Sequence, residues 1–358
     1  MIKPKIIAFY LPQFHPTKEN DGWWEPGFTE WTNVAKAKPL FPGHYQPKLP
    51  GELGFYDLRL SETREKQAEL ARHAGIDGFC YWHYWFEGRR LLNRVFDEVL
   101  ESGKPDFPFC LCWANHSWYK KTWNNDGKDK LLIEQTYGGK KDYEEHFYAL
   151  LPAFKDHRYM KINGKLIFGI FASYDFKDFR LFEKTWNKLA RENNISEFWF
   201  FGYTGSISKI EKTDNNGFEN IVVNYTLTPF EKKNILKKKF IQFNRKIFNI
   251  PFLTSFDEYS KYVIRNYKHE GRYYLSICPN FDHSPRSGSQ GLIITGSNPS
   301  KWKFFFKEVL RLLEKEKIEN NILFIKAWNE WGEGNYLEPD RKFGRGYLNA
   351  MKEILENL

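Results

Sequence analysis

The chain has 358 residues, of which 41% are hydrophobic, 28% are charged and 18% are aromatic, and its formal net charge is +9. The aromatic content excludes an intrinsically disordered chain, because disordered segments are poor in aromatic residues. No window offers the roughly 18 uncharged apolar residues that a membrane-spanning helix needs. The net charge favours acidic partners in general and does not choose among nucleic acid, anionic lipid, nucleotide and charged polysaccharide.

Segments typical of strands alternate with segments typical of helices along the whole chain. The expected strands are 6–11, 78–85, 109–115, 166–171, 198–203, 220–224, 273–279 and 323–328. The expected helices are 61–74, 91–102, 142–154, 179–193, 257–269, 299–317 and 347–358. Eight strands with intervening helices predict a (β/α)8 TIM-like barrel. A doubly wound sheet alternates in the same way, but no G-x-G-x-x-G or Walker sequence follows any strand.

We predict one (β/α)8 domain over residues 1–358, with long loop insertions at about 12–60 and 225–256. The second loop is basic, with apolar residues between the charges. Three interpretations are open: a basic lid, a membrane-surface helix and a solvated basic helix. Segment 232–246 is therefore a candidate for peripheral contact with a membrane or an anionic ligand.

The first residues contain only a short apolar stretch before Pro12 and no small-residue cleavage site, which is typical of a first strand and not of a signal peptide. We therefore expect a cytoplasmic protein, located at the inner membrane if segment 232–246 contacts lipid. The cysteines Cys80, Cys110, Cys112 and Cys278 lie in apolar runs without metal-ligand spacing, so we expect buried, reduced thiols. We predict no metal and no cofactor.

Polar and aromatic residues gather at the predicted strand ends, where (β/α)8 barrels carry their active sites. Sugar rings present flat C–H faces that pack on indole, and sugar hydroxyls bind carboxylates, amides and imidazoles. Such a mixture favours a carbohydrate cleft, although any single ring could instead pack between barrel and helices. The candidate substrate-binding residues are His15, Trp24, Tyr81, His83, Trp113, Asn115, His116, Asn280, Asp282, Trp328 and Asn329.

Glu330 and Glu333 are the strongest candidates for catalysis. Three residues of extended backbone span at most about 10 Å, so both carboxylates can reach one cleft. Glycosidic cleavage generally needs two carboxyl groups, one to protonate the leaving oxygen and one to assist attack at the sugar. Two surface glutamates are the alternative, and the spacing does not decide between retention and inversion.

Several sequence blocks together resemble the WbsX-type family, which is also described as glycoside hydrolase family 99-like and in places is named glycosyltransferase. The blocks run in order from about residue 7 to residue 339. They are AFYLPQFHP, DGWWEPGFTEWTNV, GFYDLRL, AGIDGFCYWHYWF, PFCLCWAN, NFDHSPR and AWNEWGEGNYLEPD.

The resemblance implies a (β/α)8 barrel similar to family 99 endo-α-mannosidases, which cleave with retention through a 1,2-anhydro sugar. Their N-E-W-x-E-G motif matches residues 329–334 here. It implies Glu330 as the base that deprotonates the sugar 2-hydroxyl and Glu333 as the general acid/base, whose pKa Trp328 and Trp331 would raise by desolvation. His116 departs from the W-A-N-E-N-W pattern common in relatives, so we expect a different substrate pocket.

We therefore predict a retaining, endo-acting glycoside hydrolase or transglycosylase that acts on a bacterial surface polysaccharide, either O-antigen or capsule. The alternative is a glycosyltransferase that uses a nucleotide-linked or lipid-linked sugar. Against a metal-dependent transferase, no D-x-D sequence occurs; an E-x7-E spacing exists at Glu308 and Glu316, on a charge-rich helix where it arises easily by chance. A glycan-binding barrel without activity is a third reading. The expected partner is an oligosaccharide or polysaccharide and not nucleic acid, and the oligomeric state is not predicted.

Overall fold

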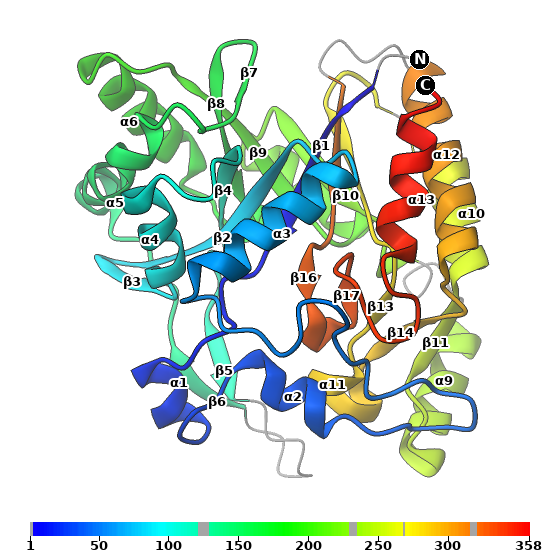
Figure 1. Cartoon of the computed structure of the whole chain (residues 1–358). Coiled ribbons are helices and arrows are strands. Elements are labelled where there is room, and N and C mark those ends of the chain that lie inside the picture. Colours follow the sequence, from blue (N-terminus) through cyan, green and yellow to red (C-terminus); the bar gives the residue numbers. More distant parts are fainter. Residues whose placement is uncertain (1–2, 121–128, 229–234, 268, 316–320) are drawn as a thin grey trace.

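The computed structural model describes residues 3–120, 129–228, 235–267, 269–315 and 321–358. In these ranges, eight parallel strands form a closed barrel in chain order, because the first strand pairs with both the second and the last (Figure 1). The barrel strands are β1 (Lys5–Tyr10), β2 (Gly78–Phe86), β4 (Phe109–Trp113), β8 (Lys165–Ile170), β9 (Phe198–Thr204), β10 (Asn220–Asn224), β12 (Tyr273–Ile277) and β15 (Ile322–Ile325). The predicted (β/α)8 barrel is confirmed.

The helices between the strands cover the outside of the barrel (Figure 1). They are α3 (Ser61–His73), α4 (Arg94–Ser102), α5 (Gly139–Phe154), α6 (Phe179–Glu192), α7 (Ile210–Asn215), α10 (Phe256–Asn266), α12 (Pro299–Lys315) and α13 (Gly346–Leu355). Each predicted helix is present within the described residues, with most ends shifted by a few residues, and residues 316–317 of the predicted helix 299–317 lie outside them. The polar helix α7 was not predicted, because so short a segment shows no apolar periodicity.

Alternation along each strand sends successive side chains to opposite sides of the barrel wall. In β2, Trp82 faces the interior, where its ring stacks on Phe9 with a centroid distance of 4.6 Å. Phe171 and Tyr203 continue this aromatic layer, their rings stacked at 5.3 Å. Much of the aromatic content is therefore barrel filling. The four cysteines are buried and free, as expected.

The two long insertions lie at the end of the barrel to which the strands point, and they contain short helices and strands (Figure 1). Residues 12–60 hold α1 (Lys18–Trp23) and α2 (Glu30–Lys36), whose first turns are capped by the hydroxyls of Thr17 and Thr29. Residues 225–256 hold α9 (Ile235–Phe248) and β11 (Phe252–Ser255). The helix α9 agrees with the helical interpretations of the second insertion, whereas α1, α2 and β11 were not predicted.

Shorter elements complete the loops around the barrel. They are β3 (Arg89–Leu91), β5 (Trp118–Lys120), β6 (Lys130–Ile133), β7 (Lys161–Ile162), β13 (Phe281–Asp282), β14 (Leu292–Thr295), β16 (Asn329–Glu330), β17 (Asn335–Tyr336), α11 (Ser284–Ser287), η1 (Ser173–Asp175), η2 (Ile207–Lys209), η3 (Gly288–Gln290) and η4 (Trp331–Glu333). Of the helices within the described ranges, none is both long and apolar enough to span a membrane.

Gly169 in β8 gives the first test of the barrel interior. A methyl group there would collide with the ring of Phe201 and lie 2.7 Å from Sγ of Cys112. We expect Gly169→Ala to lower the free energy of unfolding by about 1–3 kcal/mol through overpacking. Urea denaturation measures this. The control is Gly22→Ala in α1, where a Cβ has no heavy atom within 4 Å. It should leave stability unchanged or raise it by up to about 1 kcal/mol, and equal effects of both changes would contradict the packing.

Candidate active site

The chain segment that follows β15 brings both candidate carboxylates to the end of the barrel. Glu330 ends the short strand β16 and Glu333 ends the single turn η4. Two glycines make this tight path feasible. A Cβ at Gly332 would overlap the carboxylate of Glu30, and Gly334 adopts a positive φ of 50°.

Lys326, which directly follows the last barrel strand β15, lies between the two carboxylates. Its Nζ is 2.6 Å from Oε2 of Glu333 and 3.4 Å from Oε2 of Glu330. These two carboxylate oxygens are therefore no more than about 6 Å apart. Lys326 and Glu333 are each only 14–15% exposed, and Glu330 is 5% exposed. The ammonium is thus a shared, largely buried counter-ion, and it keeps two like charges in one site.

Arg286 of α11 supplies a second cation to the same cluster. Its Nη1 donates to Oε1 of Glu333 at 2.6 Å and lies 4.0 Å from Glu330. The other side of the guanidinium contacts Glu30 of α2 at 3.0 Å. Glu330 also accepts a hydrogen bond of 2.8 Å from Nε1 of Trp82, on strand two. Residues far apart in the sequence therefore fix the two candidate carboxylates.

The two carboxylates differ in proton affinity. Burial, followed by the negative charge of Glu333, raises the pKa of Glu330 from 4.5 to about 7. Burial alone would also raise the pKa of Glu333, but the charges of Lys326 and Arg286 outweigh it and hold this pKa well below its usual range. Between about pH 5 and 6 the pair therefore holds one proton, and the surrounding charges place it on Glu330.

The pKa of Glu333 is lowered overall and not raised, contrary to the expectation that Trp328 and Trp331 would raise it by desolvation. The indole of Trp331 instead donates to Glu338 at 2.6 Å. Glu338 is buried and also accepts from Tyr56 at 2.8 Å and from Gln67 at 2.6 Å, while its burial raises its pKa to about 7. Residues 326–334, which carry both candidate carboxylates, are called the catalytic loop below. Glu338 connects this loop to α3, because it binds both Trp331 and Gln67.

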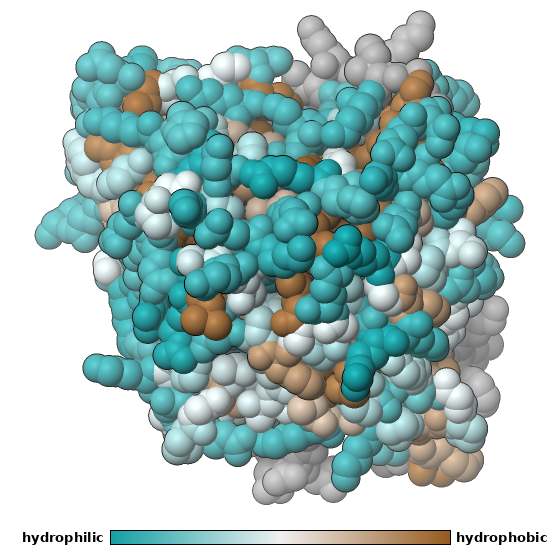
Figure 2. All heavy atoms as spheres, in the orientation of Figure 1, coloured by the Kyte–Doolittle hydropathy of each residue, from teal (hydrophilic) through white to brown (hydrophobic). Residues whose placement is uncertain are grey.

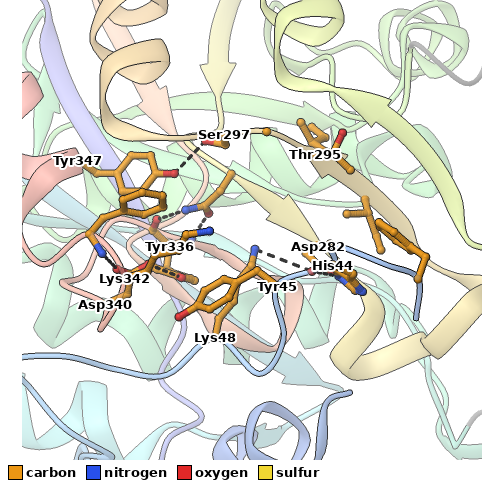
Figure 3. A pocket seen from close by; sticks show the side chains of 17 residues that line it. His44, Tyr45, Lys48, Asp282, Thr295, Ser297, Tyr336, Asp340, Lys342 and Tyr347 are labelled. Atoms are coloured by element: carbon orange, nitrogen blue, oxygen red, sulfur yellow. Dashed lines mark hydrogen bonds and ion pairs between the residues drawn. The ribbon is translucent and has the colours of Figure 1, made fainter. Parts of the chain in front are cut away.

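Two of the predicted substrate-binding residues, Asn280 and Asp282, line a cavity of about 260 Å³ (Figure 3). The aromatic rings on its wall include those of Tyr45, Tyr336, Phe343 and Tyr347. The cavity adjoins the catalytic loop, because Nζ of Lys48 in its wall donates to the carbonyl of Gly334 at 3.3 Å. Asp282 accepts from His44 at 2.8 Å. A pocket of aromatic, cationic and carboxylate groups can hold one sugar ring.

His116 is the other predicted residue near the carboxylates. Its side chain is exposed, and its ring lies 5.3 Å from that of Phe171 in the aromatic layer of the barrel. Glu333 acts electrostatically on His116. The imidazole therefore faces the same end of the barrel as the catalytic loop.

Tyr81, His83 and Trp113 lie on the opposite side of the barrel wall from the carboxylates. Tyr81 packs against Tyr10 at 4.5 Å, and Nε2 of His83 lies 2.8 Å from Nε2 of His146 on α5. The indole of Trp113 donates to the carbonyl of Trp85. They have the wrong parity in their strands, so we revise their assignment from substrate binding to packing between barrel and helices.

The remaining predicted residues either hold the loops of the barrel together or lie away from the two carboxylates. Asn329 binds both backbone groups of Leu11 with its amide, at 2.7 and 3.0 Å, and thereby fixes the catalytic loop to the end of β1. Asn115, which follows β4, binds both backbone groups of Ala172, which follows β8, and so connects the ends of these two strands. His15 and Trp328 are buried, and the ring of Trp328 packs against that of Phe79 at 5.3 Å. Trp24, next to α1, is 40% exposed and could contact a ligand.

Sequence reasoning missed Trp82, Lys326 and Arg286, which contact the candidate carboxylates, and Glu30, which contacts Arg286. Trp82 was missed because β2 is buried on both faces, so its sequence does not reveal which side chains face the barrel interior. Lys326, Arg286 and Glu30 offered no pattern either, since a pairing between remote charges leaves no periodic signal. Arg286 and Glu30 do lie inside the sequence blocks NFDHSPR and DGWWEPGFTEWTNV.

Comparison with known proteins connects this geometry to a family. The family model "Glycosyltransferase WbsX" matches residues 6–351. The chain belongs to the WbsX family. Similar proteins called WxcX, described as uncharacterized, occur in two strains of Xanthomonas campestris pv. campestris. They are 31% identical over 355 residues, which are 98% of this chain and 49% of theirs. The chain thus spans about half the length of the curated relatives it matches.

Solved structures share the fold of this WbsX family member. The GH99 endo-alpha-mannosidase from Bacteroides thetaiotaomicron superposes with a TM-score of 0.55 at 14% identity, over 100% of this chain and 98% of the other. A glycoside hydrolase-like protein superposes with a TM-score of 0.59 at 15% identity, over 98% and 93% of the two chains. At these identities the likeness establishes the barrel alone.

The shared ammonium of Lys326 makes a prediction about stability. We expect Lys326→Met to lower the free energy of unfolding by about 3–5 kcal/mol at pH 8, because it leaves buried like charges uncompensated. The loss should shrink at pH 5. The folded protein holds the Glu330 proton more tightly than the unfolded chain, so protonation on acidification relieves the repulsion.

Denaturant unfolding at both pH values measures this effect. The matched control is Lys352→Met, which breaks an exposed pair with Glu356 of 3.7 Å and should change stability by at most about 0.5 kcal/mol. If Lys326→Met behaves like this surface control, Lys326 does not carry the electrostatic role described above.

Proposed function

We propose that this WbsX family member is a retaining, endo-acting glycoside hydrolase or transglycosylase that acts on a bacterial surface polysaccharide, either O-antigen or capsule. The observation that carries the proposal is the pair Glu330 and Glu333 around one ammonium at the open end of the barrel. The bound of about 6 Å between their oxygens keeps both carboxylates within reach of one glycosidic linkage, as cleavage by two carboxyl groups requires.

In the proposed reaction, Glu330 accepts the proton of the sugar 2-hydroxyl, and O2 attacks C1 of the same ring. The glycosidic bond breaks, and Glu333 gives its proton to the leaving oxygen. Glu333 then removes a proton from water or from an acceptor hydroxyl, which opens the 1,2-anhydro ring at C1. Glu330 returns its proton to O2. Two displacements at C1 leave its configuration unchanged.

This sequence needs the proton of the pair on Glu333, whereas the cations now favour it on Glu330. The position of Lys326 offers the switch, since its ammonium is 2.6 Å from one carboxylate and 3.4 Å from the other. We infer that glycan binding draws the ammonium toward Glu330. A shift of about 1 Å would lower the proton affinity of Glu330 and raise that of Glu333. The total number of protons stays the same.

The cavity next to the catalytic loop supports an oligosaccharide as the substrate. It shares the Gly334 turn with the site through Lys48, and its wall carries the rings of Phe41, Tyr45, Tyr336, Phe343 and Tyr347. We propose that it holds a sugar residue beside the one that is cleaved. The cytoplasm, at the inner membrane, is the proposed location.

The decisive experiment incubates the protein with polysaccharide from the producing cell and analyses the products by mass spectrometry and by NMR of the anomeric protons. We expect Glu330→Gln and Glu333→Gln each to reduce turnover by about 10²- to 10⁴-fold. The matched control is Glu308→Gln on α12, which carries the first glutamate of the E-x7-E spacing. If both active-site changes leave turnover intact, the assignment of these glutamates is wrong.

A second candidate is the glycosyltransferase, which the name of the matching family model favours. It predicts saturable binding of a nucleotide-linked or lipid-linked sugar and transfer to an acceptor. In that case Glu308→Gln, and not Glu333→Gln, would reduce activity if the E-x7-E spacing were functional. The same panel of variants therefore separates the two functions.

The pH dependence of kcat/KM gives an independent prediction. Catalysis by an acid and a base needs one proton on the pair, whichever residue holds it. We expect kcat/KM to be level between about pH 5 and 6 and to fall above about pH 7, where the Glu330 pKa marks loss of that proton. Lys326→Met should move the falling limb to higher pH, because the ammonium lowers that pKa. A kcat/KM that rises through pH 7 would contradict the shared proton.

A further inference from the structure

Helix α9 (Ile235–Phe248) presents large apolar side chains to solvent. Phe243, Ile247 and Phe248 are 54%, 56% and 62% exposed. Phe243 and Ile247, at positions i and i+4, lie on one side of the helix, and Phe248 follows Ile247 at its C-terminal end, so exposed apolar side chains gather at the C-terminal end of α9. Brown spheres gather at the lower right of Figure 2, where Figure 1 places α9. A cluster of large apolar side chains exposed to solvent is typical of an interaction surface.

The charge of the same segment restricts its partner. Residues 235–248 contain no Asp or Glu and five basic residues, which are Lys237, Lys238, Lys239, Arg245 and Lys246, whereas Lys232 and Lys233 of the predicted segment 232–246 lie outside the described residues. A second copy would bring two such helices together around a twofold axis, with repulsion between their like charges. An apolar stripe within a basic segment instead fits a bilayer surface with anionic headgroups.

The helix lies at the same end of the barrel as the candidate active site (Figure 1). Nη1 of Arg245 contacts Oε1 of Gln290 in η3 at 3.4 Å. The turn η3 directly follows α11, which carries Arg286 of the catalytic cluster. A surface bound by α9 would therefore lie beside the opening of the barrel.

We propose that α9 lies in the surface of an anionic membrane, with Phe243, Ile247 and Phe248 inserted among the acyl chains, and that it brings the site to a lipid-carried glycan. Membrane binding itself stands independently of the catalytic assignment. The lipid-carried substrate rests on the proposed function.

The experiment measures sedimentation of the full chain with two kinds of vesicle. One kind contains phosphatidylcholine alone, and the other contains phosphatidylcholine with about 30% of the anionic lipid phosphatidylglycerol. We expect binding to the anionic vesicles, release at high salt and weak binding to phosphatidylcholine. The triple variant Phe243→Ser/Ile247→Ser/Phe248→Ser should lower the partition coefficient by at least about tenfold, since each side chain loses apolar burial. Lys239→Glu, made in the otherwise unaltered chain, should also weaken binding to the anionic vesicles, because it replaces a positive charge with a negative one.

The matched control is Tyr148→Ser on α5, a helix on another side of the barrel, where the side chain is 52% exposed. It should bind vesicles like the unaltered chain, and so should Glu330→Gln, because binding does not need catalysis. The triple variant should keep its activity on soluble glycan. Absence of vesicle binding, or equal binding by the triple variant, overturns the proposal. A dimer that the triple variant dissolves, without vesicle binding, would assign the face to a second copy.

Discussion

The ammonium of Lys326 between Glu330 and Glu333 is the interaction on which the candidate site depends. Two carboxylates that are 5% and 15% exposed repel each other strongly unless a cation is shared or one of them holds a proton. This site does both. Lys326 and Arg286 fix Glu333 as the anion, and the resulting charge, together with burial, gives Glu330 its higher pKa. The unequal pair follows from where the cations lie.

The surrounding structure keeps this arrangement in place. Gly332 leaves the room that Glu30 fills, so Arg286 can bridge α2 and the catalytic loop. Asn329 ties that loop to the end of β1, and Glu338 fastens Trp331 from behind. These contacts come from distant parts of the chain. The insertion at 12–60 thus helps to build the site, since it supplies Glu30 and the cavity residue Lys48.

The sequence predicted the barrel well because alternating strands and helices are a local, periodic signal. It also predicted that Glu330 and Glu333 lie close together, since a short loop after the last strand carries both side chains. It failed for Tyr81, His83 and Trp113. In strands that are buried on both faces, a residue's parity is not visible from composition. It missed Lys326 and Arg286 because the partner of a buried charge is set by the tertiary structure. The high aromatic content likewise divides into barrel filling, outer packing and a few exposed rings only in three dimensions.

The central claim is that the two carboxylates have unlike proton affinities. It is tested most directly by NMR titration of the full chain with ¹³C-labelled glutamate side chains, assigned with Glu330→Gln and Glu333→Gln. The account predicts that the Glu330 carboxyl carbon titrates at about pH 7, whereas that of Glu333 titrates below the ordinary range for glutamate. Two carboxyl groups that both titrate near pH 4.5, the ordinary value, would contradict it.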